Sequence, residues 1–215
     1  MLKRHLSIQK NDECCLTIDF RRQWVVVQKS EGAVDPRIRR TRLLLQEALA
    51  KLLTKKDFND VSIQDIADEA TVNRATFYDH YPDKSALLAC MVGCRFHQLL
   101  ADRQIQFEGS CRSELKAIVR AVCDYLTRMQ GPKGKRQVGP DMESAIIAAV
   151  RGILLAGLKQ HVPGSAMAPE MIAASASWAI FGAAKEWAQT PNRCSPEEVA
   201  DTVTMLVSPM LQIPG

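Results

Sequence analysis

The sequence predicts an all-α fold in two parts, and three observations support this prediction. Apolar residues recur at helical spacing along most of the chain from residue 36 onward. Residue types that cap helices stand where these periodic segments begin. Stretches rich in glycine, proline or charge separate the segments, and no alternating strand pattern competes with them. We expect a three-helix amino-terminal domain over residues 35–84 and a larger helical domain over residues 85–215.

Composition limits the class of protein. The chain has 215 residues, of which 47% are apolar, so it can form a hydrophobic core without disulfide bonds. Its seven cysteines are an odd number in a chain without an export signal, which favours reduced thiols. The first residues lack the apolar run of a secretory signal, and no stretch approaches the ~18 apolar residues that a membrane span needs. We expect a cytoplasmic protein with no membrane partner.

Residues 1–34 show no sustained periodicity and are expected to form a weakly ordered extension. The first helix is predicted over residues 36–53, because Leu45, Leu49 and Leu52 fall at helical intervals and Pro36 suits a first turn.

Residues 61–84 predict two short helices joined by a tight turn, with a third helix directly after them. Ser62, Asn73 and Asp83 are each placed to cap one of these helices. Ile63, Ile66, Ala67 and Ala70 share one face of the first helix, and Val72 lies in the turn where it can bridge both helices.

The second helix of this pair has a polar face. Phe77 and Tyr81 supply apolar contacts on one side, while Arg74, Tyr78 and Asp79 leave the other side able to form hydrogen bonds. Pro82 disfavours helical geometry at Tyr81, so the helix ends after roughly two turns. This geometry is suited to inserting a helix into a DNA groove.

The segment IADEATVNRATFYDHYPDKSAL resembles the amino-terminal signature of the TetR (tetracycline-repressor-like) family of bacterial transcription regulators, over about residues 37–90. The resemblance implies a helix-turn-helix DNA-binding domain over residues 35–84. One position departs from the pattern, because Thr71 stands where family members usually carry glycine. A β-branched residue there requires either a different turn or about 1–3 kcal/mol of backbone strain.

The resemblance also implies which residues touch DNA. Residues 35–84 contain nine Lys/Arg and nine Asp/Glu, so position and not bulk charge supports this prediction. Arg74 is the main candidate for reading a base, because arginine can bind guanine through two hydrogen bonds. Tyr78, His80 and Lys84 match positions that hold phosphates, and the Arg37–Arg42 cluster can add to them. The predicted DNA-binding set is Arg40, Gln64, Asn73, Arg74, Ala75, Thr76, Tyr78, Asp79, His80 and Lys84.

Five further helices are expected, over residues 84–106, 113–130, 141–160, 169–189 and 196–210. The basic segment 131–136 between two of them is interpreted as a solvated loop. Residues 171–188 are apolar nearly all round, which favours a subunit interface over a purely internal core helix. In the family that the chain resembles, this helix and the last one form a four-helix dimer bundle. The interface residues predicted here are Trp178, Phe181, Gly182 and Trp187.

The domain over residues 85–215 is expected to bind a small-molecule effector among its helices, as helical bundles often do. The candidates are amphipathic or polarizable residues on apolar helices, and ordinary core packing is the alternative for each. They are Cys94, His97, Tyr125, Met129 and Trp178. Cys90, Cys94 and His97 also share one helix face, which leaves a metal or thiol sensor open as another interpretation.

The sequence thus predicts a homodimeric regulator that binds a palindromic operator in double-stranded DNA and is released by a small effector. Repression is the usual mode in the family, and activation remains an alternative. No nucleophile, base and oxyanion donor can be assembled, so no catalytic residue, cofactor or metal site is predicted. The other interpretations are a thiol- or metal-responsive regulator of the same fold and a helical cytosolic enzyme.

Overall fold

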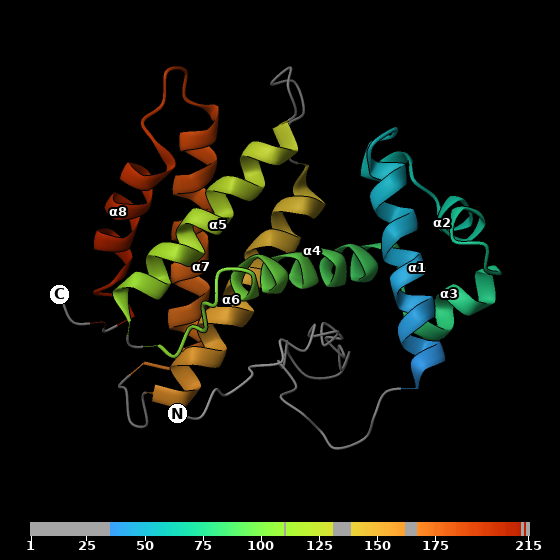
Figure 1. The fold of residues 1–215 in the computed structure, drawn as a ribbon, viewed down its shortest axis with the longest axis horizontal. Coiled ribbons are helices and arrows are strands. Elements are labelled where there is room, and N and C mark those ends of the chain that lie inside the picture. The colour runs from blue at the N-terminus through green and yellow to red at the C-terminus, as the bar shows by residue number, and fades with distance from the viewer. Residues whose placement is uncertain (1–34, 110, 131–138, 162–166, 212, 214–215) are drawn as a thin grey trace, which may run out of the picture.

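A computed structural model describes residues 35–109, 111–130, 139–161, 167–211 and 213. These residues form eight α-helices and a short 3-10 helix and contain no strand, which confirms the all-α prediction (Figure 1). The predicted extension over residues 1–34 and the basic segment 131–136 lie outside the described residues. The helices are α1 (Pro36–Leu53), η1 (Phe58–Asp60), α2 (Ile63–Glu69), α3 (Arg74–His80), α4 (Lys84–Ala101), α5 (Arg112–Gln130), α6 (Pro140–His161), α7 (Pro169–Gln189) and α8 (Pro196–Val207).

Helix α4 connects the two parts of the molecule. Its first half lies against α1, and the helix then runs into the bundle that α5 to α8 form (Figure 1). Within the bundle, α6 packs between α4 and α7, while α5 contacts both α7 and α8. In the described part of the chain, no helix has the length and apolar character to cross a bilayer.

The small domain has its own apolar centre. Leu45 and Leu49 of α1 meet Ile66 of α2 and Phe77 of α3, and all four side chains are fully buried. Helical spacing puts these residues on the inner faces of their helices, and this burial leaves the opposite face of α3 free.

Two helix ends differ from the sequence prediction. Helix α4 stops at Ala101, whereas the apolar pattern suggested an end near residue 106. The Ile105 N–H donates to the Leu100 carbonyl and the Gln104 N–H to the Ala101 carbonyl, with Gln104 at φ 56°. This is a Schellman arrangement, which terminates a helix even where the left-handed residue is not glycine. Helix α8 ends at Val207, short of the predicted end at residue 210.

The segment that follows α4 lies closely against α6. A Cβ atom added to Gly157 of α6 would lie 2.5 Å from the Phe107 ring, 2.7 Å from the Phe107 carbonyl oxygen and 2.9 Å from the Gly109 nitrogen. Only glycine permits this approach between α6 and the segment that follows α4.

Candidate nucleic-acid interface

Helix α3 presents a polar face to solvent while its other face is buried. The Asn73 side chain caps the helix, because its Oδ1 accepts hydrogen bonds from the Thr76 backbone N–H at 2.7 Å and from the Thr76 hydroxyl at 3.1 Å. Phe77 anchors the inner face at 0% exposure. The residues exposed on the outer face are Arg74, Ala75, Tyr78 and Asp79, and all four belong to the predicted DNA-binding set.

The sequence left two alternatives for the turn between α2 and α3, a different turn geometry or backbone strain at Thr71. The structure shows the strained conformation. Thr71 has φ 58°, in the left-handed region where a β-branched residue is disfavoured. The N–H groups of Thr71 and Val72 donate back to the carbonyls of Asp68 and Ala67, so the turn requires this conformation. The sharp turn sets the angle at which α3 leaves α2.

Arg74 and Tyr78 are paired on the exposed face of α3. The guanidinium Nη2 donates to the Tyr78 hydroxyl at 3.3 Å, and the guanidinium carbon lies 5.7 Å from the centre of the Tyr78 ring. Both contacts restrict the rotamers of an otherwise mobile arginine side chain.

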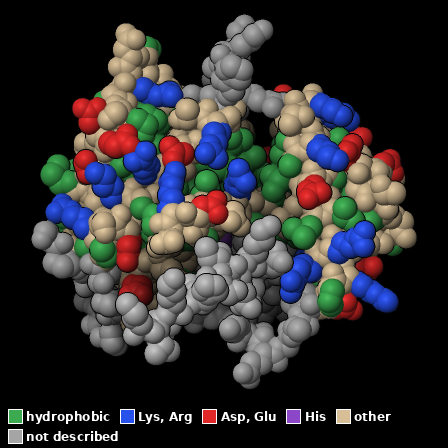
Figure 2. All heavy atoms as spheres, viewed as in Figure 1, with side chains coloured by type: hydrophobic (Ala, Val, Ile, Leu, Met, Phe, Trp, Pro, Cys, Tyr) green, Lys and Arg blue, Asp and Glu red, His purple; other side chains and the backbone are tan. Residues whose placement is uncertain are grey.

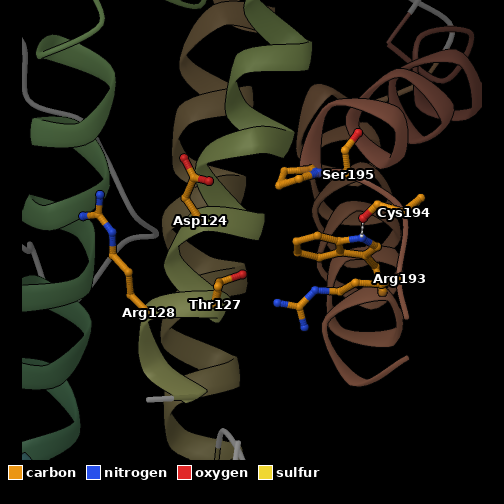
Figure 3. Close-up of a pocket in the computed structure, with 8 residues that line it drawn as sticks. Asp124, Thr127, Arg128, Arg193, Cys194 and Ser195 are labelled. Atoms are coloured by element: carbon orange, nitrogen blue, oxygen red, sulfur yellow. Dashed lines mark hydrogen bonds between the residues drawn. The ribbon is translucent and has the colours of Figure 1, made fainter. Parts of the chain in front are cut away.

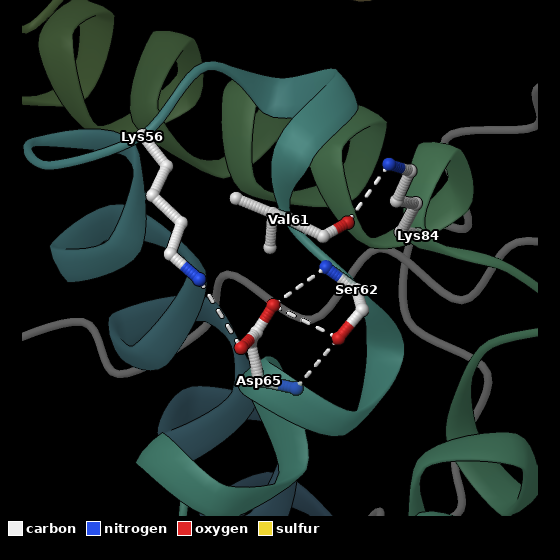
Figure 4. A network of polar contacts seen from close by, with 5 residues as sticks. All are labelled: Lys56, Val61, Ser62, Asp65 and Lys84. Carbon is white, nitrogen blue, oxygen red and sulfur yellow. Dashed lines mark hydrogen bonds and ion pairs between the residues drawn. The ribbon is translucent and has the colours of Figure 1, made fainter.

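The start of α2 is held by a capping box. Ser62 Oγ accepts from the Asp65 N–H at 3.0 Å, and Asp65 Oδ2 accepts from the Ser62 N–H at 2.9 Å (Figure 4). The Ser62 hydroxyl also donates to Asp65 Oδ2, at 2.8 Å. The backbone and hydroxyl donors of Ser62, followed by Lys56 Nζ at 3.2 Å, lower the pKa of the Asp65 carboxyl to about 2. Gln64 on the next position is exposed, and its amide donates to Asp68 Oδ1 at 2.8 Å.

His80 and Arg40 lie at the edges of the proposed interface. His80 is half-buried, and burial, followed by the charge of Arg42, lowers its pKa from the usual value of 6.5. The imidazole is therefore neutral at pH 7 and can act as a hydrogen-bond donor but not as a cation. Arg40 is exposed on the first turns of α1. Acidic and basic side chains are interspersed over the face of the molecule shown in Figure 2.

Lys84 is not free to bind a phosphate, which corrects its predicted role. Its ammonium group donates to the backbone carbonyls of Phe58, Asn59 and Val61 at 2.9, 3.1 and 2.8 Å (Figure 4 shows the bond to Val61). An ammonium group has three donors, and these three carbonyls use them all. The sequence pattern shows the position of this lysine in the chain but not these carbonyls, which the α1–α2 connection brings to it.

A polar cluster joins α1, the end of α3 and α4. The Gln46 amide donates to the Tyr81 hydroxyl at 3.3 Å, and both Gln46 and Tyr81 donate to Cys90 Sγ at 3.6 Å. The contact with Cys94, followed by burial, strongly raises the pKa of the Cys90 thiol. Cys90 is therefore a protonated structural thiol. Among the described residues, no group of three His, Cys, Asp or Glu side chains could hold a metal ion.

The predicted effector residues are distributed over several helices. Tyr125 of α5 packs against Phe96 of α4 with ring centres 5.0 Å apart, and its hydroxyl lies 4.0 Å from Met142 Sδ. Burial lowers the pKa of His97. Cys94, His97, Tyr125 and Met129 are all half-buried. Trp178, by contrast, is 63% exposed on the outside of α7, so its predicted place in an internal pocket is wrong.

A cavity that sequence reasoning did not predict lies between α5 and the connection from α7 to α8. Its volume is about 490 Å³, and none of the predicted effector residues lines it (Figure 3). The Trp187 indole N–H donates to the Cys194 carbonyl at 2.9 Å, and the Arg193 guanidinium lies 4.5 Å from the indole centre. The lining residues are Asp124, Thr127, Arg128, Trp187, Arg193, Cys194, Ser195 and Pro196.

The predicted interface on α7 needs correction at two of its four residues. Phe181 and Trp187 are 2% and 7% exposed, because they pack into the core of their own chain. Trp178 and Gly182 are exposed. Other large apolar residues are exposed on α7, on α8 and just after α8, and they are Met171, Met205, Leu206 and Met210.

Comparison with known proteins identifies the small domain. Residues 45–91 match the family model described as bacterial regulatory proteins, tetR family. The chain is 41% identical to the HTH-type transcriptional regulator YxbF of Bacillus subtilis over 66 residues, which are 30% of this chain and 17% of YxbF. The similarity to this curated relative is thus confined to a small part of its length.

The fold of this chain also resembles solved structures, over most of its length. A TetR transcriptional regulator from Rhodococcus sp. RHA1 has a TM-score of 0.55 at 18% identity, and the likeness covers 80% of this chain and 96% of that one. A TetR-family regulator from Streptomyces coelicolor A3 has a TM-score of 0.55 at 17% identity, with coverage of 84% and 99%. These two structures confirm the predicted all-helical fold. The family model agrees with the predicted helix-turn-helix domain over the residues that it matches.

Proposed function

We propose that this chain, whose residues 45–91 match the model of the tetR family of bacterial regulatory proteins, is a homodimeric transcription regulator of that family. In this proposal it represses transcription from a palindromic operator in double-stranded DNA, and a small-molecule effector releases it. The proposal places the protein in the cytoplasm, where the DNA is.

The proposal rests on one observation, which is that α3 has one buried face and one polar face exposed to solvent. Phe77 fixes the helix to the core, while Arg74, Ala75, Tyr78 and Asp79 face solvent on a helix of seven residues. We propose that Arg74 reads a guanine and that Ala75 or the Thr76 methyl meets a thymine methyl. Tyr78, His80 and Arg40 contact phosphates, Gln64 contacts DNA from α2, and Asn73 and Asp79 complete the interface.

To test DNA reading, the purified protein selects duplexes from a randomised pool over several rounds of binding. We expect the pool to converge on an inverted repeat, because a two-fold dimer presents two identical copies of α3. A pool that stays random after selection contradicts the proposed function. Arg74→Ala should remove the preference at one base pair per half-site, with a loss of discrimination of about 1–3 kcal/mol.

The dimer in this proposal uses the exposed apolar surface of α7 and α8. Met171 and Trp178 are seven residues apart and so lie on one side of α7. Met205 and Leu206 are exposed on α8, which packs against α7. Large exposed apolar patches on soluble domains mark interaction sites. Trp178→Glu should convert the dimer to a monomer in analytical ultracentrifugation, whereas Ala50→Glu on the exposed side of α1 should not. A wild-type protein that is monomeric at all concentrations contradicts this part of the proposal.

The effector site in this proposal lies among α4, α5 and α6, where Cys94, His97, Tyr125 and Met129 combine apolar surface with a few polar groups. A library of apolar and aromatic small molecules can be screened for compounds that weaken binding to the selected duplex. Tyr125→Ala should abolish the response to an active compound without changing DNA binding in its absence. An unchanged response in this variant would place the effector elsewhere.

A further inference from the structure

Lys84 occupies a position that helix electrostatics alone disfavours. It is the first residue of α4, directly after the Asp83 cap, and the first turn of α4 contains no acidic residue. A cation at a helix amino terminus meets the positive end of the helix dipole, which is unfavourable. A compensating interaction must therefore stabilise the ammonium group.

The compensation comes from the connection between α1 and α2. The Phe58, Asn59 and Val61 carbonyls converge on Lys84 Nζ, and the ammonium lies 4.7 Å from the centre of the Phe58 ring. Charge-assisted hydrogen bonds are about twice as strong as neutral ones, and the ring adds a cation–π contact. The lysine thus joins residues that are 23 to 26 positions away in the sequence.

The carbonyls belong to the segment that determines where α2 begins. Val61 directly precedes Ser62, which caps α2 and is itself bonded to Asp65 (Figure 4). Val61 is also buried in the core of the small domain. The bonds of Lys84 thus connect the first turn of α4 to the start of α2, and the tight turn at Thr71 connects α2 to α3.

We propose that Lys84 is a positioning residue that clamps the first turn of α4 to the entrance of α2 and so holds α2 and α3 in the orientation in which they bind DNA. This inference rests on the proposed function, since it concerns how the DNA-reading helices are set. In this role Lys84 binds backbone carbonyls of its own chain and does not contact a phosphate of the DNA.

Two variants separate the clamp from a phosphate contact. Lys84→Met removes the charge and keeps most of the stem, while Lys84→Arg keeps the charge but cannot direct one ammonium at three converging carbonyls. If the clamp operates, both variants lose affinity for the duplex selected by the wild-type protein, by about 2- to 30-fold. Both should also keep the wild-type slope of log K against log salt concentration.

A phosphate contact gives the opposite pattern and would overturn the proposal. Lys84→Arg would then bind like the wild type, and Lys84→Met would have a salt slope less steep by about 0.9 for each phosphate that it no longer neutralises. Lys159→Met, a charge change on α6 far from α2, controls for the effect of net charge. All assays are run at a temperature where circular dichroism shows each variant to be folded, so that a loss of stability alone does not lower the affinity.

Hydrogen exchange provides a second measurement that needs no DNA. Backbone amides of residues 58–66 should exchange faster in both Lys84 variants, while those of α6 and α7 remain as in the wild type. Unchanged exchange over residues 58–66 contradicts the clamp. If the wild-type protein selects no sequence from the randomised pool, the proposed function fails, whereas the exchange result still decides whether Lys84 holds the α1–α2 connection.

Discussion

The guanidinium of Arg74 donates a hydrogen bond to the hydroxyl of Tyr78, one turn further along α3. The tyrosine oxygen accepts this bond and keeps its own proton for donation, so Tyr78 can hold the arginine and contact a phosphate at the same time. A side chain that is restrained before binding loses less entropy when it binds.

Replacing Tyr78 tests whether it orients Arg74. Tyr78→Phe keeps the ring beside the guanidinium but removes the acceptor, so we expect discrimination at the base pair read by Arg74 to fall by up to about 1 kcal/mol. Titrations with the selected duplex and with a duplex changed at that base pair measure the effect. Adding Tyr78→Phe to Arg74→Ala should cause no further loss of discrimination. An equal loss of affinity for every duplex would instead identify Tyr78 as a phosphate contact alone.

Thr71→Gly should stabilise the small domain. Glycine adopts φ 58° without a steric penalty, so removing the β-branched side chain relieves strain at a modest cost in unfolded-chain entropy. We expect a net gain of about 1 kcal/mol in the free energy of unfolding. Asn192→Gly is the matched control, because asparagine at φ 52° tolerates this conformation and should gain less. Chemical denaturation measures both, and a less stable Thr71→Gly protein would mean that the threonine side chain makes a compensating contact.

His97 should make the protein sensitive to mild acid. Burial lowers its folded-state pKa below the usual 6.5, so its contribution to stability is fully present above pH 6.5 and is lost as pH falls through the folded pKa. We expect the melting temperature to drop between about pH 7 and pH 5, and His97→Gln to reduce this drop. His80→Gln, at a less buried site, should reduce it less. The same pH dependence in His97→Gln and the wild type would exclude His97 as the cause.

The cysteines should differ widely in reactivity. The Ser113 hydroxyl, 2.9 Å from Cys111 Sγ, and backbone N–H groups at the start of α5 lower the pKa of the half-buried Cys111 thiol. We expect iodoacetamide to modify Cys111 faster than Cys90 by on the order of tenfold or more in the native protein, with Cys90 reacting after denaturation. Peptide mass spectrometry gives both rates. Ser113→Ala should slow the reaction of Cys111, and a fast reaction of native Cys90 would revive the thiol-sensor interpretation.

Local signals made most of the fold predictable from sequence. The caps at Ser62, Asn73 and Asp83 each accept the backbone hydrogen bond that their residue types predicted. Pro36 and Pro169 start their helices as expected. These predictions succeeded because capping and first-turn preferences depend on only a few neighbouring residues.

The errors arose where distant segments decide the outcome. An apolar helix pattern indicates burial but not which surface covers the helix, so it predicts a subunit interface at Phe181 and Trp187, although their own chain covers them. The family resemblance predicts a phosphate contact for Lys84, and the sequence gives no sign of the carbonyls of residues 58–61 that bind it, because they lie far from it along the chain. The end of α4 has no glycine signal, because Gln104 takes the left-handed position.

The approach of Gly157 to Phe107 and Gly109 makes the segment after α4 sensitive to a single methyl group. Between α6 and this segment there is no room for a Cβ atom at position 157. Gly157→Ala would therefore push residues 107–109 away from α6 and loosen the packing where the chain passes from α4 to α5.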